Sequence, residues 1–164
     1  TGQGYTLADA DLLDPLMALA READVPVMLH VNEQLGHAYP GKCDQGPREA
    51  LALAQRYPLN RLILAHLGGG LPFFELMPSV RPALQSVYYD TAAGTLLYDD
   101  IALQHILAWT PERLVWGSDY PLLRQSRFLQ RVRRLALEPD ALARLLGENA
   151  RRVLGGRLAP AEGV

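Results

Sequence analysis

The sequence predicts an α/β fold in which four short strands form a parallel sheet, because apolar runs of strand length alternate with helical patterns. Four runs are apolar along their whole length rather than at every second position, which is typical of strands buried on both faces. They cover residues 25–31, 62–65, 87–89 and 114–116. A strand–helix–strand order implies parallel pairing through right-handed crossovers. Such a sheet is either open, as in a doubly wound fold, or part of a closed barrel.

Helical patterns stand before, between and after these runs. Apolar side chains at helical spacing share one face over residues 12–20, 50–57, 101–109 and 128–136, and Pro47 suits a first turn. A last helix over 142–154 is interrupted near Gly147. The prolines at positions 72, 78 and 82 permit only short or broken helix over 71–84. We expect one domain over residues 1–154 and a flexible tail over 155–164.

Each apolar run leads into an ionisable side chain. The four are His30, His66, Asp90 and Asp119. In a barrel, parallel strands bring their carboxyl ends to one face, where active sites are built. These four side chains, from distant parts of the sequence, are therefore expected to converge. Asp90 has a second interpretation, because an aspartate before Thr91 can simply hydrogen-bond the loop that follows.

A long polar loop, residues 32–44, follows His30 directly. Loops at the top of a barrel often hold substrate. Its candidate substrate contacts are Glu33, His37, Tyr39 and Lys42, each of which has the alternative of being an ordinary loop residue. A second loop begins with three glycines at positions 68–70, which favour a tight turn that lets substrate approach His66. A phosphate cradle is the weaker interpretation, because the spacing of a dinucleotide fingerprint and the Walker lysine are both missing.

Composition and charge argue against several classes of partner. The formal net charge is −2, with 16 basic residues spread among 18 acidic ones, so we expect no nucleic-acid or anionic-membrane partner. No apolar run approaches the ~20 residues that span a bilayer. Cys43 is the only cysteine, which excludes an internal disulfide and fits a reducing, cytoplasmic compartment.

Five segments together are similar to a known family. They lie between about residue 12 and residue 154 and read PVMLHVNE, LILAHLGGGLPFFELMP, VYYDTAA, LVWGSDYPLL and LLGENARRVLG. In this order they resemble the last four strands and the closing helix of the amidohydrolase-related superfamily. Its members include metal-dependent hydrolases and the decarboxylases of aminocarboxymuconate semialdehyde and of resorcylic acids. The resemblance implies the C-terminal half, about strands 5–8, of a TIM-type (β/α)8 barrel.

The resemblance also implies roles for three residues at strand ends. His30 stands where the family has a metal ligand on its fifth strand. His66 resembles the sixth-strand histidine that lies beside the metal and polarises substrate or water. Asp119 resembles the eighth-strand aspartate that ligates the metal and exchanges a proton with bound water. Neutral imidazole and carboxylate suit a divalent ion, with Zn²⁺ the first expectation, which lowers the pKa of its water toward ~7.

One feature of the family has no counterpart in the chain, namely a His-x-His pair on the first strand. The histidines lie at positions 30, 37, 66 and 105, and no two are separated by a single residue. A complete barrel also needs roughly 250 residues. We therefore expect a fragment that lacks strands one to four or a natural half-barrel, paired with the missing N-terminal half-barrel or with a second copy. Alone, the chain should bind metal weakly and be inactive.

The functional prediction is metal-dependent hydrolysis of a C–N or C–O bond in a small-molecule substrate, with metal-bound hydroxide as the nucleophile. It requires the missing half of the barrel. One alternative, within the same superfamily, is nonoxidative decarboxylation, which uses the same ligands. The other is a non-catalytic half-barrel that serves as a binding or assembly module. The missing His-x-His pair favours that module, and the intact strand-end residues speak against it.

Overall fold

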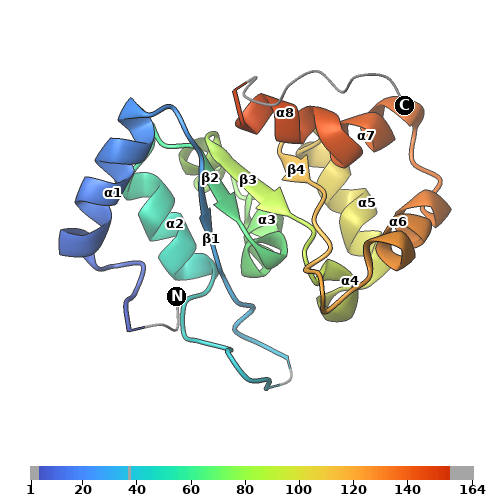
Figure 1. The fold of residues 1–164 in the computed structure, drawn as a ribbon, viewed down its shortest axis with the longest axis horizontal. Helices are drawn as coiled ribbons and strands as arrows, with labels where there is room; N and C mark the ends of the chain where they lie inside the picture. Colours follow the sequence, from blue (N-terminus) through green and yellow to red (C-terminus); the bar gives the residue numbers. More distant parts are fainter. Residues whose placement is uncertain (1–3, 37, 156–164) are drawn as a thin grey trace.

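The computed structural model describes residues 4–36 and 38–155, and in these the sheet is parallel with strand order β1-β2-β3-β4 (Figure 1). The strands are β1 (Val27–Leu29), β2 (Leu62–Leu64), β3 (Val87–Asp90) and β4 (Leu114–Val115). Each follows its predecessor in sequence and pairs beside it, for example Val27 with Leu62 and Leu62 with Val87. The predicted parallel sheet is confirmed. Its first strand is shorter than the run 25–31, since hydrogen-bonded pairing with β2 extends over only three residues.

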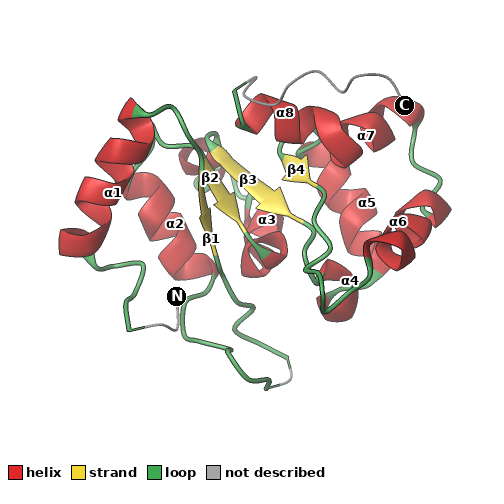
Figure 2. Cartoon of the chain, viewed as in Figure 1, coloured by secondary structure: helices red, strands yellow, loops and turns green. Residues whose placement is uncertain are grey.

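Helices connect the strands and lie on both sides of the sheet (Figure 2). In chain order they are α1 (Ala10–Glu22), α2 (Pro47–Arg56), η1 (His66–Gly70), α3 (Leu71–Phe74), η2 (Arg81–Leu84), α4 (Gly94–Leu97), α5 (Asp100–Trp109), α6 (Gln125–Arg134), α7 (Pro139–Ala143), η3 (Arg144–Glu148) and α8 (Asn149–Val153). The four predicted long helices are confirmed as α1, α2, α5 and α6. The proline-rich segment is broken as expected, and the interruption at Gly147 is a π-helical turn within η3. Among the described residues no helix is long and apolar enough to cross a membrane.

Local signals in the sequence explain where the helices begin. The Asp9 side chain caps α1 by accepting a hydrogen bond from the Leu12 amide at 3.3 Å. At α2, Pro47 occupies the first turn, and Glu49 Oε2 accepts from the Gly46 amide at 2.9 Å. No helix was predicted at α4, because four residues are too few to show helical periodicity.

The two faces of the sheet are covered very differently. Alternate strand residues belong to the main core with buried side chains of α1, α2, α5 and α6: Leu29, Leu62, Leu64, Val87, Tyr89 and Leu114. On the opposite face, Ile63 and Val115 form a small cluster with Val153 of α8. Met28, which pairs with Ile63 and shares its face, is 59% exposed. The second face is thus covered by α8 at β2 and β4 and exposed at β1.

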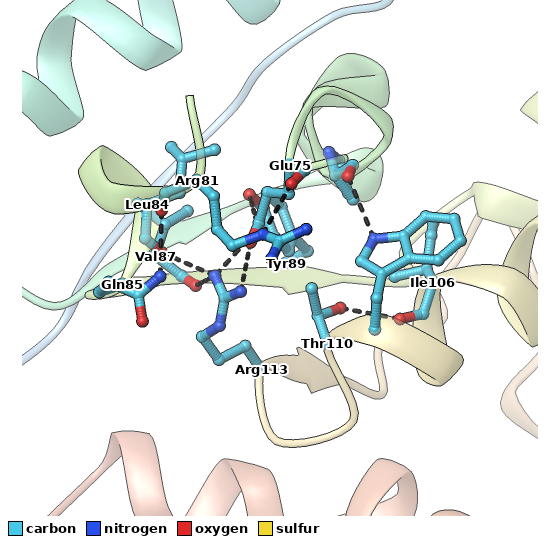
Figure 3. Close-up of polar contacts among 11 residues, drawn as sticks. Glu75, Arg81, Leu84, Gln85, Val87, Tyr89, Ile106, Thr110 and Arg113 are labelled. Carbon is cyan, nitrogen blue, oxygen red and sulfur yellow. Dashed lines mark hydrogen bonds and ion pairs between the residues drawn. The ribbon is translucent and has the colours of Figure 1, made fainter. Parts of the chain in front are cut away.

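A buried ion pair stabilises the amino-terminal end of the sheet (Figure 3). Glu75 is only 1% exposed, and its carboxylate is paired with the Arg113 guanidinium. The Tyr89 hydroxyl donates to Glu75 Oε1 at 2.6 Å, and Arg113 also donates to the carbonyl oxygen of Leu84 at 2.6 Å. Burial, followed by the Glu75 charge, raises the pKa of Tyr89 well above its ordinary value. The network fastens the turn after α3 to the residue that precedes β4.

Candidate active site

The carboxyl ends of the strands bring His30, His66 and Asp119 to one cavity. His30 follows β1 directly, His66 opens η1 after β2, and Asp119 lies in the loop after β4. All three line a cavity of about 430 Å³. Its other walls are Tyr39, Pro40, Gly41, Ala93, Leu96, Leu97 and Leu122. Two imidazoles and a carboxylate therefore face a space whose remaining walls are largely apolar.

The two histidines are in direct contact although 36 residues separate them in sequence. His30 Nδ1 lies 2.9 Å from His66 Nε2. The ring centroids are 4.8 Å apart at an interplanar angle of 79°, so one ring presents its edge to the other. Burial, and then the neighbouring His66, lower the pKa of His30, which favours its neutral form.

Asp90 holds the His66 loop in place. Its Oδ1 accepts hydrogen bonds from the backbone amides of His66 at 2.9 Å and Ala92 at 3.0 Å. The Asp90 side chain is buried, and this burial raises its pKa, against the lowering effect of the two amides. The Ala92 carbonyl in turn lies 3.0 Å from His66 Nδ1. Asp90 is not among the residues that line the cavity, and its role as a substrate contact stays a prediction.

Several residues at the cavity adopt left-handed backbone conformations. His66 has φ 57°, Asp119 has φ 61° and Ala93 has φ 52°. Such conformations cost non-glycine residues about 1–3 kcal/mol each and cluster at functional sites. In the glycine turn, a Cβ at Gly69 would lie 2.2 Å from the Asn32 carbonyl oxygen, so glycine is needed there for close backbone approach.

The loop after β1 is tied together by a chain of polar contacts. Tyr39 lines the cavity and donates from its hydroxyl to Glu33 Oε2 at 3.1 Å. Glu33 Oε1 forms an ion pair with Lys42 Nζ at 3.2 Å. Glu33 lines a neighbouring cavity of about 530 Å³ rather than the cavity of the histidines. Lys42 is not among the residues that line either cavity. The predicted contact His37 lies outside the described residues, and substrate binding by Glu33, Tyr39 and Lys42 stays a prediction.

Sequence reasoning did not single out Asn32, although it is fully buried beside His30. Its Oδ1 lies 3.2 Å from His30 Nε2. The available signal was its position, because a polar side chain two residues after His30 points to the same side of an extended chain.

His30 and Asp119 supply a nitrogen and an oxygen donor to the same cavity, as a divalent ion would require. Within residues 4–36 and 38–155, however, no group of three or more His, Cys, Asp or Glu side chains is placed to hold a metal ion. Stable metal sites normally use three or more protein ligands. The described residues thus fit part of a metal site and do not complete one.

Comparisons with known proteins agree with this geometry. The model of the amidohydrolase family matches residues 1–156. No match was found among curated proteins.

Three solved structures of similar fold were compared with the chain. A 5-carboxyvanillate decarboxylase from Sphingomonas paucimobilis is 17% identical, with TM-score 0.68, over 86% of this chain and 52% of that one. An uncharacterised TIM-barrel protein from Bordetella bronchiseptica is 18% identical, with TM-score 0.67, over 93% and 53%. A dihydroxybenzoic acid decarboxylase from Polaromonas sp. JS666, with bound manganese and the inhibitor 2-nitroresorcinol, is 18% identical, with TM-score 0.65, over 88% and 54%.

At these identities the likeness establishes the fold alone. The chain spans a little over half the length of these structures, between 52% and 54%. The predicted partial TIM-type barrel is thereby confirmed. Together, the family match over residues 1–156 and the parallel half-barrel show that this chain belongs to the amidohydrolase family.

Proposed function

We propose that this chain forms half of the catalytic barrel of a metal-dependent enzyme that decarboxylates a small aromatic acid without oxidation. The observation that carries the proposal is the convergence of His30, His66 and Asp119 on one cavity with largely apolar walls. Its volume of about 430 Å³ falls within the ordinary range for small-molecule sites. Two of the structures that share its fold are decarboxylases of aromatic acids, which supports this reaction over hydrolysis.

The chemistry needs a proton at a ring carbon and no net oxidation. A proton is added to the carbon that bears the carboxylate, the bond between that carbon and the carboxylate breaks, and its electron pair returns to the ring as CO2 leaves. We assign proton delivery to Asp119. We assign orientation of the substrate to His66, whose Nδ1 lies 3.0 Å from the Ala92 carbonyl oxygen. The apolar walls exclude water, which strengthens electrostatic interactions within the cavity.

A divalent metal belongs to the proposal, with His30 and Asp119 as ligands. When bound, the ion would neutralise the negative charge of an acidic substrate and hold it against the two histidines. Manganese in a structure of similar fold supports a divalent ion, and Zn²⁺ remains the other candidate. Because the described residues complete no metal site, we propose that the missing half of the barrel supplies the further ligands.

Exposed apolar surface supports the other half-barrel as the source of those ligands. The Met28 side chain is exposed, so the second face of the sheet is uncovered at β1. On α1, Leu12, Leu16 and Leu19 form an outer stripe with exposures of 49%, 45% and 63%. Among the described strands, β1 pairs only with β2, which leaves backbone groups on its outer edge available for pairing. At the other edge, the Leu114 carbonyl and the Trp116 amide are already bonded to Asn149 and Leu145. We propose that a complementary half-barrel covers these surfaces, with a second copy of the chain as the alternative occupant.

Hydrolysis of a C–N or C–O bond is the second candidate, and the amidohydrolase family match favours it. The two reactions separate in one assay of the complete barrel assembly loaded with Mn²⁺. Release of CO2 from hydroxybenzoates, without cleavage of amides, esters or lactones, is the expected result. Asp119→Asn should abolish it, while His105→Gln, an exposed change on α5, should not. If the assembly turned over only amides or lactones, hydrolysis would be the function and the decarboxylation proposal would be wrong.

A further inference from the structure

We propose that the cavity of about 530 Å³ beside the histidine cavity is a second binding site, and that it takes an uncharged phenol. It lies at the carboxyl end of the sheet, between the loop after β1, the glycine turn of η1 and α3. Its volume falls within the ordinary range for small-molecule sites. The identity of the phenol as the reaction product rests on the proposed function, because loss of CO2 from a hydroxybenzoate leaves an uncharged phenol. The binding itself rests only on the residues that line the cavity.

Aromatic side chains form a large part of the lining. Phe73 and Phe74 of α3 line the cavity together with Tyr98, the residue that follows α4. The ring centroids of Phe73 and Tyr98 are 6.1 Å apart at an interplanar angle of 47°. Phe74 is 48% exposed, so its ring retains apolar surface that a ligand can cover. Aromatic rings pack favourably edge-to-face or offset against one another, which favours a flat aromatic ligand.

The Tyr98 hydroxyl is available to a phenol within this apolar lining. A Cβ at Gly70 would lie 3.2 Å from the Tyr98 hydroxyl oxygen, so that oxygen lies close to the glycine turn. Within residues 4–36 and 38–155, no group forms a hydrogen bond with it. Burial, followed by the charge of Glu33, raises the pKa of Tyr98 to about 12, so the hydroxyl keeps its proton at neutral pH. It can therefore donate to a phenolic oxygen or accept from a phenolic hydroxyl.

The charge at this cavity disfavours an acid. Glu33 is the only carboxylate among the described residues that line it, and these include no lysine, arginine or histidine. Lys42 forms an ion pair with Glu33 at 3.2 Å but is not one of the lining residues, so it offers no partner to a bound carboxylate. A carboxylate that loses water without gaining a cation is strongly disfavoured. An uncharged phenol avoids this cost, so the cavity should select the phenol over the acid.

The position of the cavity suits a product of the neighbouring site. Leu97, the last residue of α4, lines both cavities and so forms a wall between them. In the proposed function the acid occupies the histidine cavity, where a divalent ion holds its carboxylate. Once CO2 has left, the uncharged ring lacks that attachment, and the second cavity offers aromatic contacts on the other side of Leu97. The two cavities thus separate substrate from product by charge.

The test is an NMR titration of the 164-residue chain with ¹³C-labelled phenylalanine rings, without metal. Phenylalanine occurs only at positions 73, 74 and 128, and Phe128 is an internal control because it is buried in the main core on α6. Resorcinol should give saturable shifts of the Phe73 and Phe74 signals and leave Phe128 unchanged. The acid that yields resorcinol on loss of CO2, 2,6-dihydroxybenzoate, should bind at least about tenfold more weakly at neutral pH.

The unmodified chain is sufficient to refute the proposal. If resorcinol gave no saturable shift at Phe73 and Phe74, or if 2,6-dihydroxybenzoate bound there as tightly as resorcinol, the proposed site would be wrong. The titration needs neither metal nor turnover, so its result is separate from that of the decarboxylation assay. Decarboxylation by the complete assembly without resorcinol binding would refute this site alone. Resorcinol binding without decarboxylation would support the site and refute its role for a product.

Two variants identify the groups that are responsible. Tyr98→Phe removes the hydroxyl and should weaken resorcinol binding about 2–10-fold. Its matched control is Tyr88→Phe, which lines a different cavity and should leave the affinity unchanged. Glu33→Gln removes the negative charge and should strengthen the binding of 2,6-dihydroxybenzoate, with the affinity for resorcinol unchanged. Its matched control, Glu112→Gln, also lies at that other cavity and should change neither affinity. An unchanged affinity for the acid in folded Glu33→Gln would refute selection by charge.

Discussion

The two ends of the sheet differ in how their ionisable side chains are paired and in the conformation of the backbone that carries them. At the amino end, Glu75 is buried with Arg113 and Tyr89 as partners for its carboxylate. At the carboxyl end, His30 Nδ1 lies 2.9 Å from His66 Nε2, and the backbone is left-handed at His66 and Asp119. Buried polar networks stabilise when all their groups are paired. The amino end therefore secures the fold, and the carboxyl end places ionisable side chains on left-handed backbone beside a cavity.

The largest expected effect lies at the amino end. Glu75→Ala leaves the Arg113 charge without its carboxylate and should reduce the free energy of unfolding by about 3–5 kcal/mol. The control is Glu112→Ala, which removes an exposed partner of Arg152 and should cost less than about 1 kcal/mol. Urea unfolding measures both. Equal losses would mean that the buried pair contributes no more than a surface pair.

A smaller loss is expected where the loop after β1 meets the glycine turn of η1. Gly69→Ala forces a Cβ to within 2.2 Å of the Asn32 carbonyl oxygen and keeps φ at 63°, which should cost about 2–3 kcal/mol. Gly41→Ala is the matched change, with φ at 91° but nothing within 4 Å of the added Cβ, and should cost about 1 kcal/mol. If thermal unfolding gave the same loss for both, close approach at Gly69 would not matter.

The proposed function requires a second half of the barrel, so association should depend on the bare apolar surfaces. We expect the chain to pair with a half-barrel or with itself rather than to remain a stable monomer. Leu16→Glu places a charge in the exposed stripe of α1 and should weaken association at least about tenfold, or ~1.4 kcal/mol. Sedimentation measures this, with Arg133→Glu on α6 as the control. A monodisperse, cooperatively unfolding monomer of the unmodified chain would refute the expectation.

The smallest expected change in stability lies at the histidine pair. His66→Gln removes the contacts of a half-buried imidazole with the Ala92 carbonyl and with His30, so the free energy of unfolding should fall by only about 1 kcal/mol. Turnover by the complete assembly should nevertheless fall 100-fold or more. A large loss of stability, measured by urea unfolding, would place His66 with the structural groups of the amino end.

The fold was predictable because its signals are local. Continuous apolar runs identified β1 to β4, and the same runs led to His30, His66 and Asp119 at their ends. The contacts that complete the site are not local. Asn32 meets Cys43 and Tyr39 only because of the path of the loop, and Glu75 meets Arg113 across 38 residues. Neither residue type nor periodicity specifies such contacts, because they depend on how the folded backbone places atoms that are distant in sequence.

The order of the strands has a consequence for how this unit forms. Each described strand after β1 pairs with the one that precedes it in the chain, so β2, β3 and β4 each find a neighbour that is already made. During synthesis the sheet can grow by one strand–helix step at a time, and contacts that close early require little loop entropy. At β4 the growing edge ends against η3 and α8, where Leu145 and Asn149 bond the Trp116 amide and the Leu114 carbonyl. The edge that remains open is that of β1, the first strand to form, and a further strand can join there without rearrangement of those already in place.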